Sequence, residues 1–157
     1  MRFSKEYTTW IPVFLKLAQK TNGAILELGS GVFSTPLLHW VCAEKRRELW
    51  TYEDTKEYLE FAHLFKSRNH HIRLVEDWEK VDFPNGSIAL IDQIKNRAET
   101  AIMLKDKVDY VILHDSEAPE VYDYEKVYPH FKYRYDWKFC KPYATVLSNK
   151  NPLTWMI

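Results

Sequence analysis

Acidic side chains stand at or just after the end of five short apolar segments in this sequence. They are Glu27, Glu53 with Asp54, Glu76 with Asp77, Asp92, and Asp115, which follows His114. If the segments are parallel strands, these acids share one edge of a sheet, where open α/β sheets bind ligands. Each acid taken alone is more simply explained as a helix cap or loop residue. Together they predict a negative crevice, which suits a cationic ligand and disfavours a polyphosphate.

Glycine is scarce in this chain of 157 residues and is concentrated in one segment. An average content of about 7% would give roughly 11 glycines, whereas the chain has 4. Three of them, Gly23, Gly29 and Gly31, are close together, and Gly86 lies in a separate Pro-Asn-Gly turn. The cluster predicts a place where the backbone approaches a ligand closely.

The residues around these glycines discriminate between nucleotide ligands. Ser34 stands where a dinucleotide fingerprint has its third small residue. Glu27, two residues before Gly29, would repel a pyrophosphate and attract an ammonium or sulfonium group. Glu53 follows Gly31 by 22 residues, the distance at which an acid accepts hydrogen bonds from a ribose. An adenosine ligand that carries positive charge is S-adenosylmethionine.

An alternation of apolar runs and helical patterns predicts the elements that position these residues. Five parallel strands are expected over 24–28, 48–52, 72–75, 87–91 and 109–113, with helices beginning near Thr8 or Thr9, Ser34, Asp54 or Thr55, Asn96 and Pro119. The segments 132–139 and 144–147, on either side of a Lys-Pro turn, predict an antiparallel pair. The predicted fold is α/β: a doubly wound, Rossmann-like, mostly parallel seven-stranded sheet with a C-terminal antiparallel strand pair and helices on both faces.

Several local expectations accompany this fold. Ser34-Thr35-Pro36 predicts a helix that starts with a hydroxyl cap and a proline in its first turn. The run Lys45-Arg46-Arg47 is interpreted as the solvated end of that helix. His70-His71 is expected to be exposed rather than metal-binding. The apolar face expected for the first helix consists of Ile11, Phe14, Leu15 and Ala18.

Composition restricts the class of protein. The length predicts a single domain over 1–157, and 46% hydrophobic residues suffice for a core. Lys plus Arg (22) equals Asp plus Glu (22), which argues against nucleic-acid and membrane partners. The aromatic residues of 132–139 are therefore interpreted as packing against helices rather than as stacking on bases. Cys42 and Cys140 are expected to be reduced thiols of a cytoplasmic protein.

Residues 25–35, Ile-Leu-Glu-Leu-Gly-Ser-Gly-Val-Phe-Ser-Thr, resemble the first motif of class I S-adenosylmethionine-dependent methyltransferases. They are most similar to a subgroup with a Gly-Ser-Gly-x-x-Ser-Thr form, several members of which methylate small molecules or sugars. Leu90-Ile91-Asp92, Arg97 and Val111-Ile112-Leu113-His114-Asp115 resemble the same subgroup. The similarity extends over nearly the whole chain, including the final strand pair.

The resemblance implies a role for each matching residue. Residues expected at the methionine part of the cofactor are Glu27, Gly29 and Gly31, with Ser30 giving backbone contact and Ser34 or Thr35 completing the loop. Glu53 would bind the ribose hydroxyls. Asp77 would hydrogen-bond the adenine and Trp78 would pack on it, although Trp78 is equally explained as a core residue. Asp92 would lie near the transferred methyl group.

The same resemblance leaves the catalytic group open. His114 is the first candidate for a general base that deprotonates a hydroxyl acceptor, with Asp92 and Asp115 as alternatives. Catechol O-methyltransferase-like enzymes hold magnesium with acids after the fourth and fifth strands, and Asp92 and Asp115 resemble part of that set. Because His114-Asp115 replaces the usual Asp-Asn pair, a divalent metal is not favoured, and Asp92 and Asp115 are the expected ligands if one binds.

The expected function is therefore methyl transfer from S-adenosylmethionine, with S-adenosylhomocysteine as product, to a hydroxyl of a sugar or other small molecule. The small-molecule or glycan acceptor would be met by loops 92–97 and 115–124 or by the second subunit of a homodimer. Two alternatives remain: a Rossmann-type nucleotide-binding oxidoreductase, and a non-catalytic module of the same fold.

Overall fold

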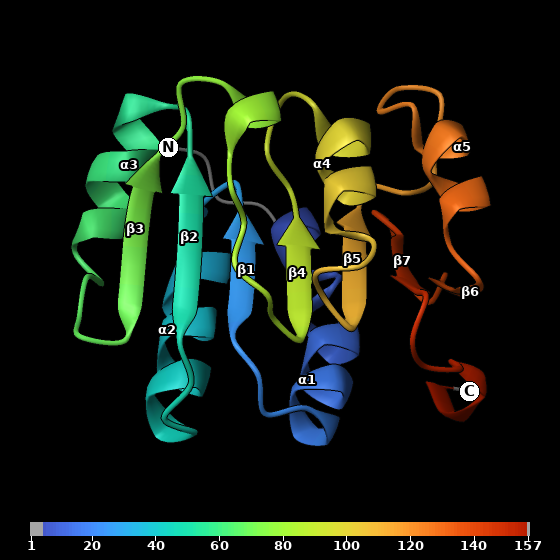
Figure 1. Cartoon of the computed structure of the whole chain (residues 1–157), viewed down its shortest axis with the longest axis horizontal. Coiled ribbons are helices and arrows are strands. Elements are labelled where there is room, and N and C mark those ends of the chain that lie inside the picture. Colours follow the sequence, from blue (N-terminus) through green and yellow to red (C-terminus); the bar gives the residue numbers. More distant parts are fainter. Residues whose placement is uncertain (1–4, 157) are drawn as a thin grey trace.

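The computed structural model describes residues 5–156 and contains one seven-stranded sheet. Its strand order is β3-β2-β1-β4-β5-β7-β6 (Figure 1). The strands are β1 (Ile25–Leu28), β2 (Leu49–Glu53), β3 (His70–Leu74), β4 (Ile88–Ile91), β5 (Tyr110–His114), β6 (Tyr133–Trp137) and β7 (Ala144–Ser148). The first five are parallel, and β7 runs antiparallel to both β5 and β6. This arrangement confirms the predicted fold class.

Helices cover both faces of the sheet. One face packs against α1 (Ile11–Lys20) and α2 (Ser34–Glu44), with α3 (Lys56–His63) beside α2. The other face packs against η2 (Trp78–Lys80), α4 (Arg97–Leu104) and α5 (Tyr124–Val127). The remaining short 3-10 helices are η1 (Lys5–Thr8), η3 (Tyr128–His130) and η4 (Thr154–Met156). No helix among the described residues is long and apolar enough to span a membrane.

The central strands are apolar at almost every position because both of their faces are buried. In β1, Ile25 faces the core on the α1–α2 side, whereas Leu26 and Leu28 face the core on the α4–α5 side. Burial of each such side chain stabilises the fold by roughly 1.5–3 kcal/mol. Glu27 alternates with these residues and is equally buried, so a carboxyl group lies inside the α1–α2 side of the sheet.

Arg47 contradicts the expectation that the basic run is a solvated helix end. Its side chain is only 4% exposed. The guanidinium donates to the backbone oxygens of Gly23 and Thr21 and to the hydroxyl of Ser87, at 2.8, 3.1 and 2.6 Å. The chain reverses after α2 through Arg46, whose φ is +52°, and this turn directs the next side chain inward. Arg47 thus links the segments before β1 and β4.

Other local expectations also differ from the structure. Helix α2 begins at Ser34, and no side chain caps it, so the predicted hydroxyl cap is wrong. In α1 the buried face contains Val13, Phe14, Leu17 and Ala18, whereas Leu15 is exposed. His70 is buried, contrary to expectation. Both cysteines are free thiols, as predicted, with Cys42 buried and Cys140 exposed.

We predict that Arg47→Met lowers the free energy of unfolding by at least about 2 kcal/mol, because buried oxygens lose charged donors. Urea unfolding followed by circular dichroism measures the change. The matched control is Lys45→Met, at an exposed position two residues earlier, which should change stability by less than about 0.5 kcal/mol. Equal effects of the two substitutions would contradict the structural role of Arg47.

Candidate functional site

A cavity of about 270 Å³ opens at the carboxyl ends of the parallel strands. Its walls come from the loops after β1, β2, β4 and β5, from η1, and from the β6–β7 turn. The lining residues are Tyr7, Gly29, Ser30, Gly31, Val32, Phe33, Ser34, Glu53, Tyr58, Asp92, Gln93, Ile94, Arg97, His114, Asp115 and Pro142. In a parallel sheet these strand ends share one edge, so residues far apart in sequence meet there.

The first glycine of the loop is required by the protein's own backbone. Gly29 has a φ of +87°, and a Cβ built on it would lie 2.5 Å from the backbone nitrogen of Gln93. Any side chain at this position would push the β1 loop away from the end of β4. At Gly31, by contrast, an added Cβ would meet only the Ser34 hydroxyl, at 2.9 Å. A side chain at Gly29 would therefore clash with the backbone after β4, whereas one at Gly31 would clash only with the Ser34 side chain.

Glu27 lies beneath the loop and does not line the cavity. It is fully buried and accepts hydrogen bonds from the hydroxyls of Thr51 (2.6 Å) and Thr35 (3.0 Å). The Thr35 hydroxyl in turn accepts the Gly31 N–H at 3.1 Å. Burial raises the pKa of Glu27 to about 7, although hydrogen bonds from Ser34, Thr51 and Thr35 act in the opposite direction. Glu27 thus holds the loop from below through Thr35.

Glu53 does line the cavity, and its carboxylate joins two loops. One oxygen, Oε2, accepts hydrogen bonds from the backbone N–H and the hydroxyl of Ser30, at 2.7 and 2.8 Å. The other oxygen, Oε1, accepts from the backbone N–H groups of Asp54 and Thr55, at 3.0 and 2.8 Å. The Ser30 hydroxyl also lies 3.2 Å from the carbonyl oxygen of Tyr58, which offers it a second acceptor.

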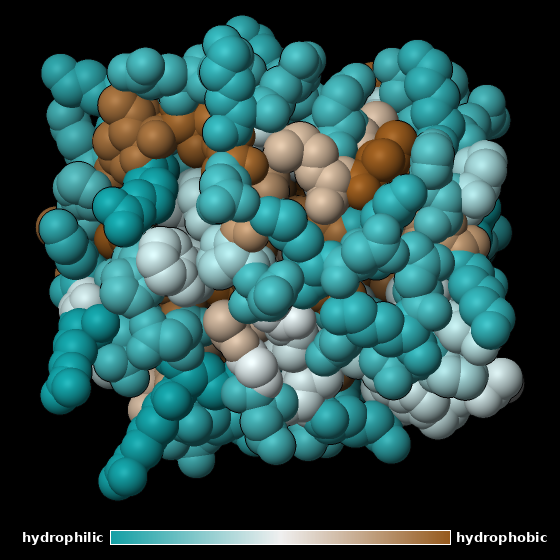
Figure 2. Space-filling view, viewed as in Figure 1, coloured by the Kyte–Doolittle hydropathy of each residue, from teal (hydrophilic) through white to brown (hydrophobic). Residues whose placement is uncertain are grey.

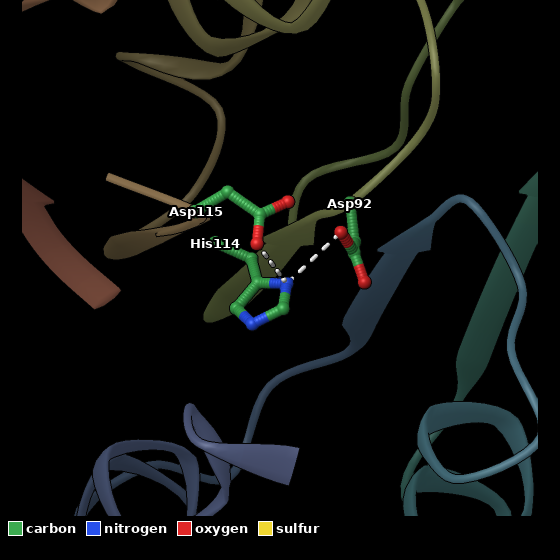
Figure 3. A group of neighbouring side chains, drawn as sticks. All are labelled: Asp92, His114 and Asp115. Atoms are coloured by element: carbon green, nitrogen blue, oxygen red, sulfur yellow. Dashed lines mark hydrogen bonds and ion pairs between the residues drawn. The ribbon is translucent and has the colours of Figure 1, made fainter. Parts of the chain in front are cut away.

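A cluster of two acids and two bases forms the other wall of the cavity. Asp92 follows β4, and His114 and Asp115 stand at the end of β5 (Figure 3). His114 Nδ1 lies 3.1 Å from Asp92 Oδ1 and 3.4 Å from Asp115 Oδ1. Arg97, the first residue of α4, donates to Asp92 Oδ1 at 3.0 Å and to Asp115 Oδ2 at 3.1 Å. Because Arg97 and His114 pair with these carboxylates, the cavity is less negative than the crevice that the sequence predicts.

Both ring nitrogens of His114 face hydrogen-bond acceptors. Nδ1 faces the two carboxylates, and Nε2 lies 3.3 Å from the hydroxyl of Thr9, which donates its own proton to the Pro142 carbonyl. Burial by itself lowers the pKa of His114, but the hydrogen bond and charge of Asp92 and the charge of Asp115 outweigh it, so the pKa is raised. The geometry favours an imidazolium, which has no lone pair with which to accept a proton.

The cluster offers three ligand atoms, from Asp92, His114 and Asp115, within 4.8 Å of one another, which is close enough for one metal ion. However, Arg97 and His114 already neutralise the two carboxylates. A divalent cation would have to displace the guanidinium and the Nδ1 proton, and both groups are almost fully buried. The residues present therefore do not fit a resident metal ion well.

Four of the residues expected at the cofactor do not line the cavity: Glu27 and Thr35, which are buried beneath the loop, and Asp77 and Trp78. Asp77 caps η2, where it accepts the Glu79 N–H, and it borders a separate shallow hollow over β2 and β3. Trp78 is buried in the core on the α4–α5 side, and its ring N–H donates to Asp54 at 3.0 Å. Sequence reasoning placed Asp77 and Trp78 by resemblance alone. Their role at an adenine stays a prediction.

Sequence reasoning did not select several residues that line the cavity, including Tyr7, Tyr58 and Pro142. Tyr7 and Pro142 come from opposite ends of the chain, and no motif marked them. Figure 2 shows apolar areas on the upper part of the molecule, the part that contains the carboxyl edge of the sheet. Exposed hydrophobic residues on segments at this edge are Leu74, Ile94, Val121 and Phe139. Of these four residues, Ile94 also lines the cavity.

The overall structure is similar to solved methyltransferases. A methyltransferase from Pyrococcus furiosus shares 16% identity, with 96% of this chain and 89% of that chain covered and a TM-score of 0.56. The N-terminal domain of human METTL16 in complex with SAH shares 12% (96% and 73% covered, TM-score 0.66). A candidate caffeoyl-CoA O-methyltransferase from Staphylococcus aureus shares 14% (94% and 85% covered, TM-score 0.66).

These similarities show that the chain has the Rossmann-like methyltransferase fold. No protein-family model matches the sequence, and the search of curated proteins gave no match. The human METTL16 domain has also been solved in complex with the MAT2A 3′UTR hairpin 1. Proteins of this fold therefore include one bound to RNA, and the expectation that this chain has no nucleic-acid partner stays a prediction.

We predict that His114 titrates above its ordinary pKa of 6.5, because the paired carboxylates favour the charged ring. Its contribution to stability is then fully present below pH 6.5 and is lost as the pH rises through the raised pKa. Nuclear magnetic resonance of the ring protons measures the titration, and Asp92→Asn should lower the pKa. A titration below pH 6.5 in the wild type would contradict the imidazolium.

Proposed function

We propose that this protein is an S-adenosylmethionine-dependent methyltransferase that acts on a hydroxyl of a small-molecule or glycan acceptor. The observation that carries the proposal is the junction of the Gly29–Gly31 loop with Glu53 and Asp92 in one cavity. The fold supports it, because the similar solved structures reported above are methyltransferases. When bound, the cofactor supplies a methyl group on a sulfonium, which is already activated for in-line displacement.

Binding of the ribose would use Glu53. Its Oε2 is engaged by the Ser30 hydroxyl, which has the Tyr58 carbonyl as an alternative acceptor. We infer that this hydroxyl turns to Tyr58 when a ribose hydroxyl donates to Glu53. The Ser30 backbone N–H would remain on the carboxylate and keep it in position. After this change of hydrogen bonds the Ser30 hydroxyl, the Glu53 carboxylate and the ribose hydroxyl each have a partner, as buried polar groups require.

Asp92 would face the reacting end of the cofactor. Its Oδ1 is held by Arg97 at 3.0 Å and by His114 at 3.1 Å. Figure 3 shows its other oxygen directed away from the histidine. In this proposal Asp92, rather than the protonated His114, is the group that accepts a proton from the acceptor hydroxyl. General bases of this kind contribute roughly 10²–10⁴-fold to rate.

The proposal includes no resident metal ion, because Arg97 already bridges Asp92 and Asp115. Positioning of two substrates can supply on the order of 7–11 kcal/mol of barrier reduction without one. The acceptor hydroxyl would reach Asp92 inside the cavity, and the rest of the acceptor would extend outward past the exposed Ile94 toward the loop that contains Val121.

We predict that isothermal titration calorimetry detects S-adenosylhomocysteine binding and that chelator treatment of the protein leaves the affinity unchanged. The cavity contains the loop and acid that a charged adenosine ligand needs. Titration with NAD under the same conditions is the control for the oxidoreductase alternative. Folded protein that binds NAD instead, or binds neither ligand at millimolar concentration, would exclude the methyltransferase.

We predict that Glu53→Ala weakens S-adenosylhomocysteine binding at least about tenfold, or roughly 1.4 kcal/mol, because charged hydrogen bonds to the ribose and to Ser30 are lost. Ser30→Ala should bind as well as the wild type or better, since it removes the donor that competes for Glu53. The matched control is Glu60→Ala, at an exposed position on α3. Unchanged affinity in Glu53→Ala would remove the ribose role.

A further inference from the structure

A continuous row of buried polar side chains leads from the glycine loop to the outer surface of α2. It starts at Glu27 in β1 and passes through Thr51 in β2 and His70 in β3 to His39 in α2. Glu27 Oε2 lies 2.6 Å from Thr51 Oγ1, which lies 2.8 Å from His70 Nε2. His70 Nδ1 lies 3.1 Å from His39 Nδ1. Glu27, Thr51 and His70 are each at most 2% exposed, whereas His39 is partly exposed.

We propose that Thr51, His70 and His39 form a proton relay between Glu27 and solvent, through which pH sets how firmly the glycine loop is held for its ligand. The part that concerns ligand affinity rests on the proposed function. The relay itself concerns only the protein.

The hydrogen bonds of the row are complete when Glu27 is ionised. Thr51 then donates its hydroxyl proton to Glu27 and accepts from His70 Nε2–H. His70 Nδ1 carries the lone pair and accepts from His39 Nδ1–H. Every neighbouring pair in the row has one donor and one acceptor, so a neutral His70 in the Nε2–H form fits this state.

The same atoms form a second complete arrangement when Glu27 is protonated. Glu27 donates to Thr51, which donates to His70 Nε2. The His70 proton is now on Nδ1, which donates to His39 Nδ1. When Glu27 loses its proton, one proton moves along each hydrogen bond of the row toward His39. His39 gains this proton on Nδ1 and releases another from Nε2 to water. Charge and atoms therefore balance without any other reactant.

The groups around the row allow both states near neutral pH. Burial, with a smaller contribution from the charge of Glu53, raises the pKa of Glu27 to about 7. Burial and His39 lower the pKa of His70 to about 4, with a smaller contribution from His71, so the ring stays neutral while its proton changes position. Cys42 of α2 also faces Glu27, but burial raises the pKa of its thiol to about 12.

The glycine loop is coupled to the row through Thr35. Its hydroxyl donates to Glu27 and accepts the Gly31 N–H, and Gly31 lines the cavity. A hydrogen bond to an ionised carboxylate is roughly twice as strong as one to a neutral group. Protonation of Glu27 therefore weakens the support of Gly31, so ligand affinity should fall as the pH is lowered. If binding requires the ionised acid, affinity should be about tenfold lower at pH 6 than at pH 8.

The relay can be tested on the unliganded wild-type protein by ¹⁵N magnetic resonance of its histidines between pH 5.5 and 8.5. We expect His70 to change from Nδ1–H to Nε2–H as the pH rises, with the midpoint at which the ¹³C signal of the Glu27 carboxyl titrates. Glu27→Gln should abolish the change of tautomer. The matched control, His71→Gln, alters the neighbouring, partly exposed histidine and should leave it intact. A single His70 tautomer throughout, or a change that persists in Glu27→Gln, would overturn the relay.

Calorimetry with S-adenosylhomocysteine at pH 6 and pH 8 tests the coupling separately. The expected tenfold difference should disappear in Glu27→Gln. If His70 changes tautomer but the wild type binds equally at both pH values, the coupling to the loop is wrong. Failure of the ligand to bind at any pH, with the tautomer change present, would overturn the proposed function and leave the relay supported.

Discussion

The buried guanidinium of Arg97 holds the ends of β4 and β5 against the start of α4. It donates to the carbonyl oxygens of Gln93 and His114 as well as to the carboxylates of Asp92 and Asp115. A buried charge costs several kcal/mol unless it is paired and fully hydrogen-bonded. Asp92 and Asp115 therefore compensate the buried charge of Arg97, whether or not they also contact a ligand. The shape of the cavity wall depends on these hydrogen bonds.

Two carboxyl groups, Asp92 in the cavity wall and Glu27 beneath the glycine loop, have opposite environments. Asp92 is paired with the guanidinium of Arg97 and the ring of His114, whereas the partners of the fully buried Glu27 are neutral hydroxyls. The site consequently combines an acid that is paired with basic side chains and an acid beneath the loop whose pKa burial raises to about 7. Burial and neighbouring charges can give chemically identical groups different pKa values within one protein.

Much of the fold could be predicted because its signals are local. Short apolar runs predicted six of the strands, and the alternation of aromatic with charged residues over 132–139 predicted β6. The Glu-x-Gly-Ser-Gly segment predicted the loop that lines the cavity. Residues with buried polar partners were missed, because Arg47 and His70 look like surface residues in a linear chain. Their partners lie in other elements, and only the packing of those elements makes burial of the polar groups favourable.

The sequence by itself determined the alternation of strands and helices, the position of the glycine loop and the presence of acids at the strand ends. These features depend on periodicity and turn chemistry within a few residues. Only the tertiary structure decided which acids meet, which are neutralised and which carry a proton. The parallel pairing of β2 with β1 sets Thr51 beside Glu27, and the packing of α2 brings His39 to His70. Protonation depends on such distances and on burial, and both exist only once the chain has folded.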